Sequence, residues 1–399
     1  MMKALNDNAH PLESLLQQHC PNGVEFKPLG EVIERVRRKV KNLNNVNVYS
    51  VSNSQGLILS TDFRDRKLYS EDISNYTLIQ KGEFAYNPAR LNIGSIAFLT
   101  DEVGAVSPMY VVFKIDEKSL NQKFLFYFLK SPTTLRKIVS LTETGARFRF
   151  DFKRWEKFPI PLPPLEIQYK IVEILDTFTE LQAELQAELE ARLKQYHYYR
   201  NKLLSFEELQ RRTDMLNGGG LKLVSLGEVC EIQKGRQLNK TELLDNGKFP
   251  VINGGISPSG FWNEGNCKAN RITISQGGAS AGYVNFMLIP FWAGAHCYVI
   301  ENEKENVVYK FLYYILKNQQ TFLMTSQYGA GIPALAKSKI EQLKIPLPPL
   351  SVQEEIVELL DKFDTLTNDL TSGIPAEIEA RKKQYEYYRE RLLSFIAKD

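Results

Sequence analysis

The sequence predicts an α+β protein in which two globular mixed α/β domains are joined by two long helices that form an antiparallel coiled coil. Three observations support this fold class. A proline-rich, helical segment occurs twice, at residues 159–206 and 344–399. The segments that precede the two copies are rich in short β-type runs, and they share sequence with each other. Self-similarity at such a long period indicates a duplicated architecture, so we expect a pseudo-twofold internal repeat.

The duplication divides the chain into segments of distinct composition. The two copies end in related strings, QYHYYRNKLLSF at Phe206 and QYEYYRERLLSF at Phe395. A charged stretch that closes in Asn217-Gly218-Gly219-Gly220 follows the first copy and has the composition of a linker. The predicted segments are a first domain over residues 1–158, a first helical repeat over 159–206, a linker over 207–220, a second domain over 221–343 and a second helical repeat over 344–399.

Both domains are predicted to mix strands and helices. LGEV at residues 29–32 recurs at 226–229, and FLFYFLK at 124–130 recurs as FLYYILK at 311–317. Between these anchors the two domains diverge, so we expect one frame that presents two different surfaces. In the first domain we expect strands within residues 47–51, 94–99 and 110–115, and helices within 12–18 and within 123–141, the latter continuing past Pro132.

Each repeat predicts a long helix. The PLPP string that opens each copy excludes helix and favours an extended backbone. Apolar residues then recur at steps of three and four over about 40 residues, a length of roughly 60 Å. So long a stripe needs a partner of equal length, and the other copy is the obvious one, although each helix could instead pack on its own domain. Gly373 and Pro375 predict a kink or a brief break in the second helix.

A four-residue sequence is repeated inside the first helix. Residues 180–191 read ELQA-ELQA-ELEA. Four residues turn a helix by about 400° and lengthen it by about 6 Å, so one copy can be gained or lost while the apolar stripe stays nearly in phase. The alternative is an ordinary Ala/Glu/Leu-rich helix of high intrinsic propensity.

Composition and charge limit the class of protein. The net charge of +3 permits a nucleic-acid partner without requiring one. The four cysteines form no CxxC pair, which favours free thiols in a reducing compartment. No apolar run reaches ~18 residues and the N-terminus has no apolar signal core, so we expect a cytoplasmic protein with no membrane segment.

The sequence holds no recognisable catalytic motif, and we expect a non-catalytic chain without a metal site. An adenine methyltransferase needs an Asp/Asn-Pro-Pro-aromatic string, and the nearest string, Asn87-Pro88-Ala89-Arg90, lacks the second proline and the aromatic residue. There is no phosphate-binding loop of the GxxxxGK type and no Pro-Asp dipeptide of the kind that begins many nuclease sites. His296 and Cys297 could together ligate zinc, but a packed pair is the better interpretation.

Several stretches could contact DNA, one in the first domain and two in the second. Residues 145–157 interleave basic and aromatic side chains, and alternation places Arg147 and Arg149 on one face of a predicted strand; the alternative is a solvated strand face. In the second domain, residues 234–240 form a basic loop, and residues 275–283 form a Gly/Ser-rich loop that permits close backbone approach, although glycine runs also make ordinary turns. The candidate DNA-binding residues are Arg90, Asn92, Arg147, Arg149, Lys153, Arg154, Lys234, Arg236, Lys240, Gln276, Tyr283 and Lys337.

These strings resemble a known family over the whole chain. IPLPPL before each helix, the opening NGVEFKPLGEV, and the strings INGG, GFWN and ISQGGASAGY are similar to the specificity subunit of type I DNA restriction-modification enzymes. The resemblance implies two variable target-recognition domains, each of which reads one half of a bipartite, asymmetric site in double-stranded DNA. It also implies helices that set the spacer and dock two modification subunits. The residues expected on the docking helices are Phe178, Leu181, Tyr196, Tyr199, Phe363, Leu366, Tyr385 and Tyr388.

The same resemblance assigns the chemistry to partner subunits. Modification subunits would bring S-adenosylmethionine and methylate adenine N6, and restriction subunits would bring ATP- and Mg-dependent translocation and cleavage, so we expect no cofactor on this chain. Base flipping into a partner's pocket would explain the lack of catalytic residues. Two alternatives stay open: a recognition subunit of another type of restriction or methylation system, and a coiled-coil scaffold that binds proteins but not DNA.

Overall fold

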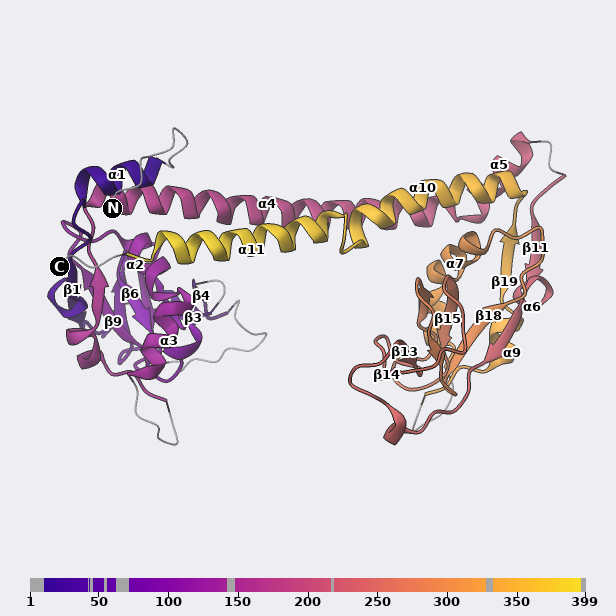
Figure 1. Ribbon diagram of the computed structural model, residues 1–399, viewed down its shortest axis with the longest axis horizontal. Helices are drawn as coiled ribbons and strands as arrows, with labels where there is room; N and C mark the ends of the chain where they lie inside the picture. The colour runs from indigo at the N-terminus through magenta and orange to yellow at the C-terminus, as the bar shows by residue number, and fades with distance from the viewer. Residues whose placement is uncertain are drawn as a thin grey trace. The chain divides into compact units, whose positions relative to one another are not determined.

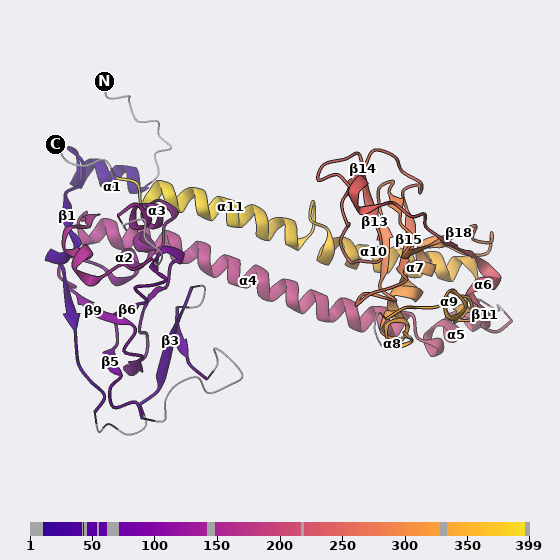
Figure 2. The same ribbon diagram turned by 90° about the horizontal axis from the view of Figure 1, so that it is seen from below.

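A computed structural model describes residues 11–41, 43, 46–53, 56–61, 72–141, 148–216, 219–327 and 333–395. The chain divides into two compact units, unit 1 (Met1–Glu184 with Ile378–Asp399) and unit 2 (Leu185–Glu377). Each unit combines strands, short helices and part of the long helices (Figures 1 and 2), and each is described by itself. The division falls within α4 (Leu165–Leu203), so both units contain part of that helix.

The principal sheet of each unit has four antiparallel strands. Their order is β2-β9-β6-β7 in unit 1 and β12-β18-β15-β16 in unit 2. Taken in chain order the strands correspond one to one, which confirms the duplicated domain. Their bounds are β2 (Ile33–Val36), β6 (Phe84–Tyr86), β7 (Ile96–Phe98), β9 (Val111–Ile115), β12 (Glu231–Lys234), β15 (Arg271–Ser275), β16 (Val284–Met287) and β18 (Cys297–Glu301).

A second sheet in each unit is built around a parallel pair. In unit 1, β3 (Val48–Ser52) pairs in parallel with β8 (Val103–Val106) and antiparallel with β4 (Gly56–Leu59), and β5 (Thr77–Gln80) lies on the other side of β8. In unit 2 the same arrangement recurs without a counterpart of β5 among the described strands. It consists of β13 (Phe249–Ile252), β14 (Phe261–Trp262) and β17 (Trp292–Ala293).

A two-stranded antiparallel sheet ties the beginning of each domain to the proline-rich string before its helix. In unit 1 it consists of β1 (Phe26–Pro28) and β10 (Pro159–Pro161), and in unit 2 of β11 (Lys222–Ser225) and β19 (Lys344–Leu347). Prolines are tolerated here because each sheet consists only of edge strands.

Helices pack against the last strand of each principal sheet. α2 (Gln122–Leu129) contacts β7 and α7 (Tyr309–Asn318) contacts β16. Together with α3 (Pro132–Ser140), α2 confirms the helices predicted within residues 123–141. The other short helices are α1 (Pro11–His19), η1 (Leu29–Glu31), η2 (Leu91–Ile93), η3 (Phe152–Lys157), α5 (Phe206–Met215), α6 (Leu226–Val229), η4 (Lys240–Glu242), α8 (Gln320–Thr325) and α9 (Lys337–Glu341). In the part of the chain that the structure describes, no helix combines the length and the apolar character needed to cross a membrane.

The first repeat forms one continuous helix, whereas the second is broken. α4 is 39 residues long, but the second copy forms α10 (Leu350–Asn368) and α11 (Ile374–Leu392). The break is organised by Asp369, whose carboxylate accepts hydrogen bonds from Ser372 and Thr371, and these bonds hold its pKa at about 2. A Cβ atom on Gly373 would lie 2.4 Å from the carbonyl oxygen of Thr365, so the turn needs glycine. The predicted interruption is therefore confirmed.

In unit 1, α11 lies beside the first half of α4 and runs in the opposite direction (Figure 1). The ring of Phe178 stacks on Tyr388 with centroids 5.5 Å apart and lies 6.2 Å from Tyr385. The apolar stripe predicted from the sequence continues into the domain core, where Ile167 and Ile171 are fully buried.

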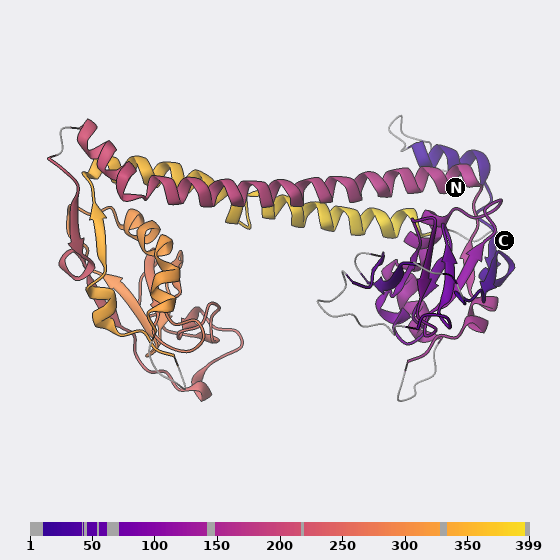
Figure 3. The ribbon, with the colours of Figure 1, turned by 180° about the vertical axis from the view of Figure 1, so that it is seen from behind.

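In unit 2, α10 lies antiparallel to the last part of α4 (Figure 3). The ring of Phe363 lies 5.6 Å from Tyr199 and 6.3 Å from Tyr196. Since Phe178 and Phe363 hold the same place in the two repeats, each unit makes the same aromatic contact with the roles of the repeats exchanged. The antiparallel helix pair expected from the sequence is thus present in both units.

The segment predicted as a linker contains a packed helix. α5 covers Phe206–Met215 and buries Leu209 completely. Arg211 and Arg212 pair with Glu208 and hold the pKa of that carboxyl at about 2, and Arg212 also pairs with Glu355 of α10 at 2.7 Å. Composition alone suggested a solvated linker because these paired charges dominate the sequence. The other predicted domain boundaries stay predictions.

Candidate nucleic-acid interface

In unit 1 two loops meet beyond the end of β6. Residues 87–90 follow that strand, and residues 148–151 precede η3. The backbone N–H of Phe150 donates to the carbonyl oxygen of Pro88 at 2.9 Å, and the Phe150 side chain is fully buried. The Asn87 side chain shapes its own loop by accepting a hydrogen bond from the N–H of Ala89 at 3.0 Å. Residues 87–90 and 148–151 are termed the first loop junction.

The first loop junction brings together two of the predicted DNA-binding residues. Arg90 and Arg149 are both exposed. Arg149 pairs with Asp151 at 2.8 Å, with 68% of its side chain accessible. An exposed pair of this kind contributes little stability, so the guanidinium can exchange the carboxylate for a phosphate or a guanine edge.

The strand predicted from the alternation at residues 147–150 is not formed in its described part. Residues 148–151 belong to no strand, because Phe150 turns into the core against Trp155 with ring centroids 4.5 Å apart, and its N–H bonds to a loop instead of a sheet. Arg147 lies outside the described residues. Lys153 is exposed on η3, whereas Arg154 is half-buried there and donates to the Leu141 carbonyl.

Unit 2 repeats this junction at the equivalent place. The N–H of Leu335 donates to the carbonyl oxygen of Gln276 at 2.7 Å, and the N–H of Gly278 donates to that of Pro333 at 2.9 Å. Residues 276–278 follow β15 and residues 333–335 precede α9, as the loops of the first junction follow β6 and precede η3. Residues 276–278 and 333–335 are termed the second loop junction.

Two further loops border the second loop junction. The N–H of Gln276 donates to the carbonyl of His296 at 2.8 Å, and the N–H of Arg236 donates to that of Ala293 at 2.8 Å. Arg236 and His296 are exposed. His296 was missed in the sequence as a possible DNA contact, because Gln276, which bonds to its carbonyl, is distant along the chain.

Gln276 is a partly buried residue of the second loop junction. Its side-chain Oε1 is buried and has no hydrogen-bond partner among the described residues. A buried polar atom in that state calls for an explanation, and a base donor would reach this oxygen only after the side chain moves.

Other predicted residues of unit 2 lie on different elements. Lys234 ends β12 and Lys240 begins η4, and both are exposed. Lys337 on α9 pairs with Glu341 at 3.3 Å. Tyr283 is a poorer candidate than predicted, because its ring is covered by the Lys317 ammonium group at 4.3 Å.

The environment of Lys317 explains that contact. Its Nζ donates to the Val284 carbonyl at 2.8 Å and to Gln320 Oε1 at 2.9 Å. Burial lowers the pKa of Lys317 to about 8. Lys317 therefore works inside unit 2 as a packing residue, and it holds Tyr283 with it.

Asn92, the remaining predicted DNA-binding residue, lies half-buried on η2. The possible metal ligands and the cysteine thiols are other residues. In the described residues no group of three or more His, Cys, Asp or Glu could hold a metal ion. His296 is exposed while Cys297 is buried, so the two do not share a site. Burial raises the pKa of Cys230 and of Cys297 to about 12, which keeps both thiols protonated.

Comparison with known proteins agrees with the duplicated fold. A family model described as the type I restriction modification DNA specificity domain matches residues 21–195 and 219–380. The chain belongs to this family. The resemblance inferred from the repeated strings is thereby confirmed. Residues 21–195 contain the first loop junction, and residues 219–380 contain the second.

Two curated relatives are similar to this chain, one over nearly its whole length and one over about three quarters of it. A putative type I restriction enzyme specificity subunit of Haemophilus influenzae is 30% identical over 98% of this chain and 100% of its own length. The EcoR124I/EcoR124II specificity subunit of Escherichia coli is 31% identical over 72% of this chain and 74% of its own. The crystal structure of a type I restriction-modification S subunit from M. genitalium shares the fold, with a TM-score of 0.59 at 20% identity and 99% coverage of both chains.

The aromatic residues predicted on the docking helices lie between the helices of the chain itself. Each aromatic ring of this set contacts a ring of the other repeat, as described for Phe178 and Phe363. Leu181 is half-buried, and Leu366 is 38% exposed. Their first role is therefore to pair the helices, and a docking role for the same helices stays a prediction.

Proposed function

We propose that the specificity chain is a non-catalytic subunit in which each unit reads one half of a bipartite, asymmetric site in double-stranded DNA. One observation carries this proposal: the two loop junctions hold the same place in a duplicated fold but present different side chains. The first loop junction presents Arg90 and Arg149, whereas the second contains Gln276 and is bordered by Arg236 and His296. Equivalent frames with unlike readers suit two unrelated half-sites.

The chemistry of these side chains suits base edges and phosphates. An arginine fork can pair with O6 and N7 of guanine or with a phosphate, and a glutamine amide can pair with N6 and N7 of adenine. In this proposal the Gln276 side chain rotates to present its amide, because its Oε1 is buried in the structure and has no partner there among the described residues.

The long helices would set the distance between half-sites and dock two modification subunits. In this proposal the modification subunits hold S-adenosylmethionine and methylate a flipped adenine, and the restriction subunits use ATP and Mg. The specificity chain then needs no cofactor of its own.

Salt-dependent DNA binding tests the recognition role. The specificity chain, purified with its modification subunits, is expected to bind duplex DNA with an affinity that falls steeply as the salt concentration rises. A plot of the logarithm of the binding constant against the logarithm of the salt concentration should have a slope of about −0.9 for each phosphate contacted. The measurement is a titration of labelled DNA at several salt concentrations. An affinity that is absent, or that does not change with salt, would point instead to a scaffold that binds only proteins.

Deleting residues 184–187, one copy of the four-residue repeat, is expected to shorten the preferred spacer. The deletion removes about 6 Å of helix, and base pairs rise ~3.4 Å, so the shift should be about two base pairs or less. The measurement is methylation of DNA substrates that carry the same half-sites with different spacers. Replacing Glu184 by Gln changes charge without changing length and serves as the control. An unchanged spacer preference in the deletion variant would contradict a spacing role for this helix.

A further inference from the structure

A buried glutamine joins α4 to the domain of unit 1. Gln168 is fully buried and lies in the first turn of the helix. Its Nε2 donates to the carbonyls of Ser119 at 2.9 Å and Pro163 at 2.8 Å, and its Oε1 accepts from the N–H of Asn121 at 2.8 Å. Asn121 is the N-cap residue of α2, so this one side chain connects the start of α4 to the start of α2.

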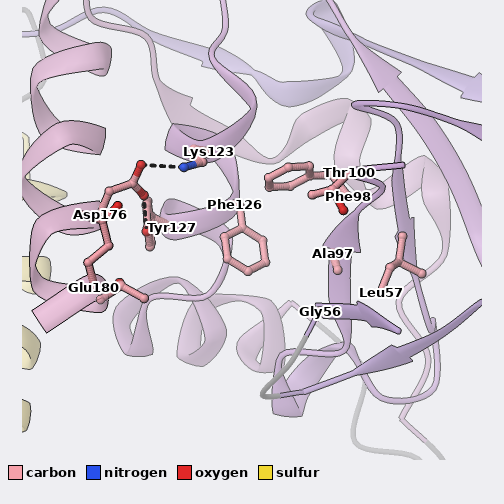
Figure 4. A pocket seen from close by; sticks show the side chains of 11 residues that line it. Gly56, Leu57, Ala97, Phe98, Thr100, Lys123, Phe126, Tyr127, Asp176 and Glu180 are labelled. Carbon is pink, nitrogen blue, oxygen red and sulfur yellow. Dashed lines mark hydrogen bonds and ion pairs between the residues drawn. The ribbon is translucent and has the colours of Figure 1, made fainter. Parts of the chain in front are cut away.

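A second contact joins the same two helices farther along. Asp176 accepts from Lys123 Nζ at 2.5 Å and from the Tyr127 hydroxyl at 2.7 Å, and both donors lie on α2. Figure 4 shows Lys123 and Tyr127 directed at the Asp176 carboxylate in one wall of a pocket. Only 24% of the Asp176 side chain is exposed.

Unit 2 contains the same set of groups. Gln353 is fully buried; its Nε2 donates to the carbonyls of Asn306 at 3.0 Å and Pro348 at 2.8 Å, and its Oε1 accepts from the N–H of Val308 at 2.8 Å. Val308 is the N-cap residue of α7.

The ion pair is repeated as well. Asp361 on α10 accepts from Lys310 Nζ at 2.8 Å and from the Tyr314 hydroxyl, and both donors lie on α7. Since α7 corresponds to α2, each long-helix segment is joined to the equivalent domain helix by the same four side chains. We term them the first register lock (Gln168, Asp176, Lys123, Tyr127) and the second register lock (Gln353, Asp361, Lys310, Tyr314).

Two attachment points fix both the position and the tilt of the domain helix on the long helix. The glutamine and the aspartate of each lock are about two helical turns apart, roughly 12 Å along the axis. A single contact would let the domain helix pivot, whereas two contacts at that separation resist both sliding and tilting. Apolar packing is less demanding, because buried apolar side chains tolerate small shifts that a satisfied polar network does not.

We propose that the register locks are positioning devices that hold each domain at a fixed place on its long helix, and that they thereby determine which spacer length the protein accepts. The inference rests on the proposed function, since a spacer exists only for a bipartite site. The loop junctions of the two units differ, whereas their locks are identical in residue type. This pattern is expected if the attachment of the domain to its helix must be the same in both units while the DNA-contacting residues differ.

The test removes one charge from each lock and leaves the shape unchanged. Asp176→Asn and Asp361→Asn each replace a carboxylate that reaches across to a domain helix. The matched controls are Glu173→Gln and Glu358→Gln, because those carboxylates pair with Lys170 and Lys362 of their own helices. The readout is methylation, by each variant in complex with the modification subunits, of duplexes whose spacer is the preferred length or one base pair longer or shorter.

The lock variants are expected to lose roughly fivefold or more of the preference for the correct spacer, while methylation at that spacer changes little. The controls are expected to keep the wild-type preference. Hydrogen exchange of the amides of Asn121 and Val308 should rise in the matching lock variant. Lys123→Gln is a second variant, milder because that side chain is half exposed, and it should reduce the preference in the same direction.

Faster exchange with an unchanged spacer preference would overturn the inference, because the locks would then be structural alone. A wild-type complex that shows no spacer preference would overturn the proposed function and the inference with it. The two failures are distinguishable, since the second appears without any substitution.

Discussion

Replacing Arg90 and Arg149 together by alanine is expected to weaken recognition of one half-site by roughly 100-fold and to leave the other half-site unaffected. Both arginines are exposed at the first loop junction, and each lost contact to a base or phosphate is worth about 1–3 kcal/mol. The measurement is competition binding with duplexes in which either half-site is scrambled. Arg236→Ala should have the reverse effect, because Arg236 borders the second loop junction.

Arg136→Ala is the matched control for this experiment. Arg136 is exposed on α3 of the same unit, where it donates to Thr133 at 3.2 Å, and it belongs to neither loop junction. It should bind both half-sites as the wild type does. If Arg90→Ala and Arg149→Ala weakened both half-sites equally, the assignment of these residues as readers of one half-site would be wrong.

Replacing Gln168 by leucine is expected to lower the free energy of unfolding by about 2–4 kcal/mol. The substitution leaves an N–H and two carbonyl groups near Gln168 without their partner, and buried polar groups in that condition cost about 1–3 kcal/mol each, in part offset by relaxation. Urea unfolding measures the effect. Gln353→Leu should cost a similar amount because its three hydrogen bonds are equivalent.

The control is Gln186→Leu, at an exposed position of α4. Glutamine and leucine have similar helix propensities, so this variant should stay within about 0.5 kcal/mol of the wild type. If Gln168→Leu lowered the free energy of unfolding by no more than this control variant does, the glutamine would not join α4 to its domain.

The helices were the part of the fold that the sequence predicted well. The stripe from Ile167 and Ile171 onward has a helical period, and the repeat supplied the partner for it. Gly373 and Pro375 marked the break between α10 and α11, because glycine allows the close approach to the Thr365 carbonyl and proline is compatible with the first turn of a helix. These signals are local, so one sequence is enough to find them.

The sheets and the loop junctions could not be predicted because they depend on partners far apart along the chain. The parallel pairing of β3 with β8, and of β13 with β17, leaves no local pattern. Alternation with its neighbours predicts a strand at Phe150, but its N–H donates to the carbonyl of Pro88 in a loop instead of to a sheet partner. His296 could not be selected without knowing that it lies beside Gln276.

The register locks could not be predicted for the same reason, because their hydrogen bonds join residues that are far apart along the chain. Gln168 and Gln353 were visible only as a shared letter in the repeated strings IPLPPLEIQ and IPLPPLSVQ. Nothing in those strings indicates that each glutamine accepts a hydrogen bond from the N-cap residue of a helix more than 40 residues away in sequence. Duplication is nevertheless a usable signal, since a polar residue kept in both copies of a diverged repeat is a candidate for a shared structural role.

Adenine methylation mapped across a genome tests the central claim most directly. The specificity chain would be co-expressed with the modification subunit of its own system in a host without other adenine methylation. The account predicts methylation at one two-part motif whose halves are unrelated and whose spacer has a single length. Methylation at one contiguous motif, or none from a complex that still forms, would contradict the claim that the two units read two half-sites.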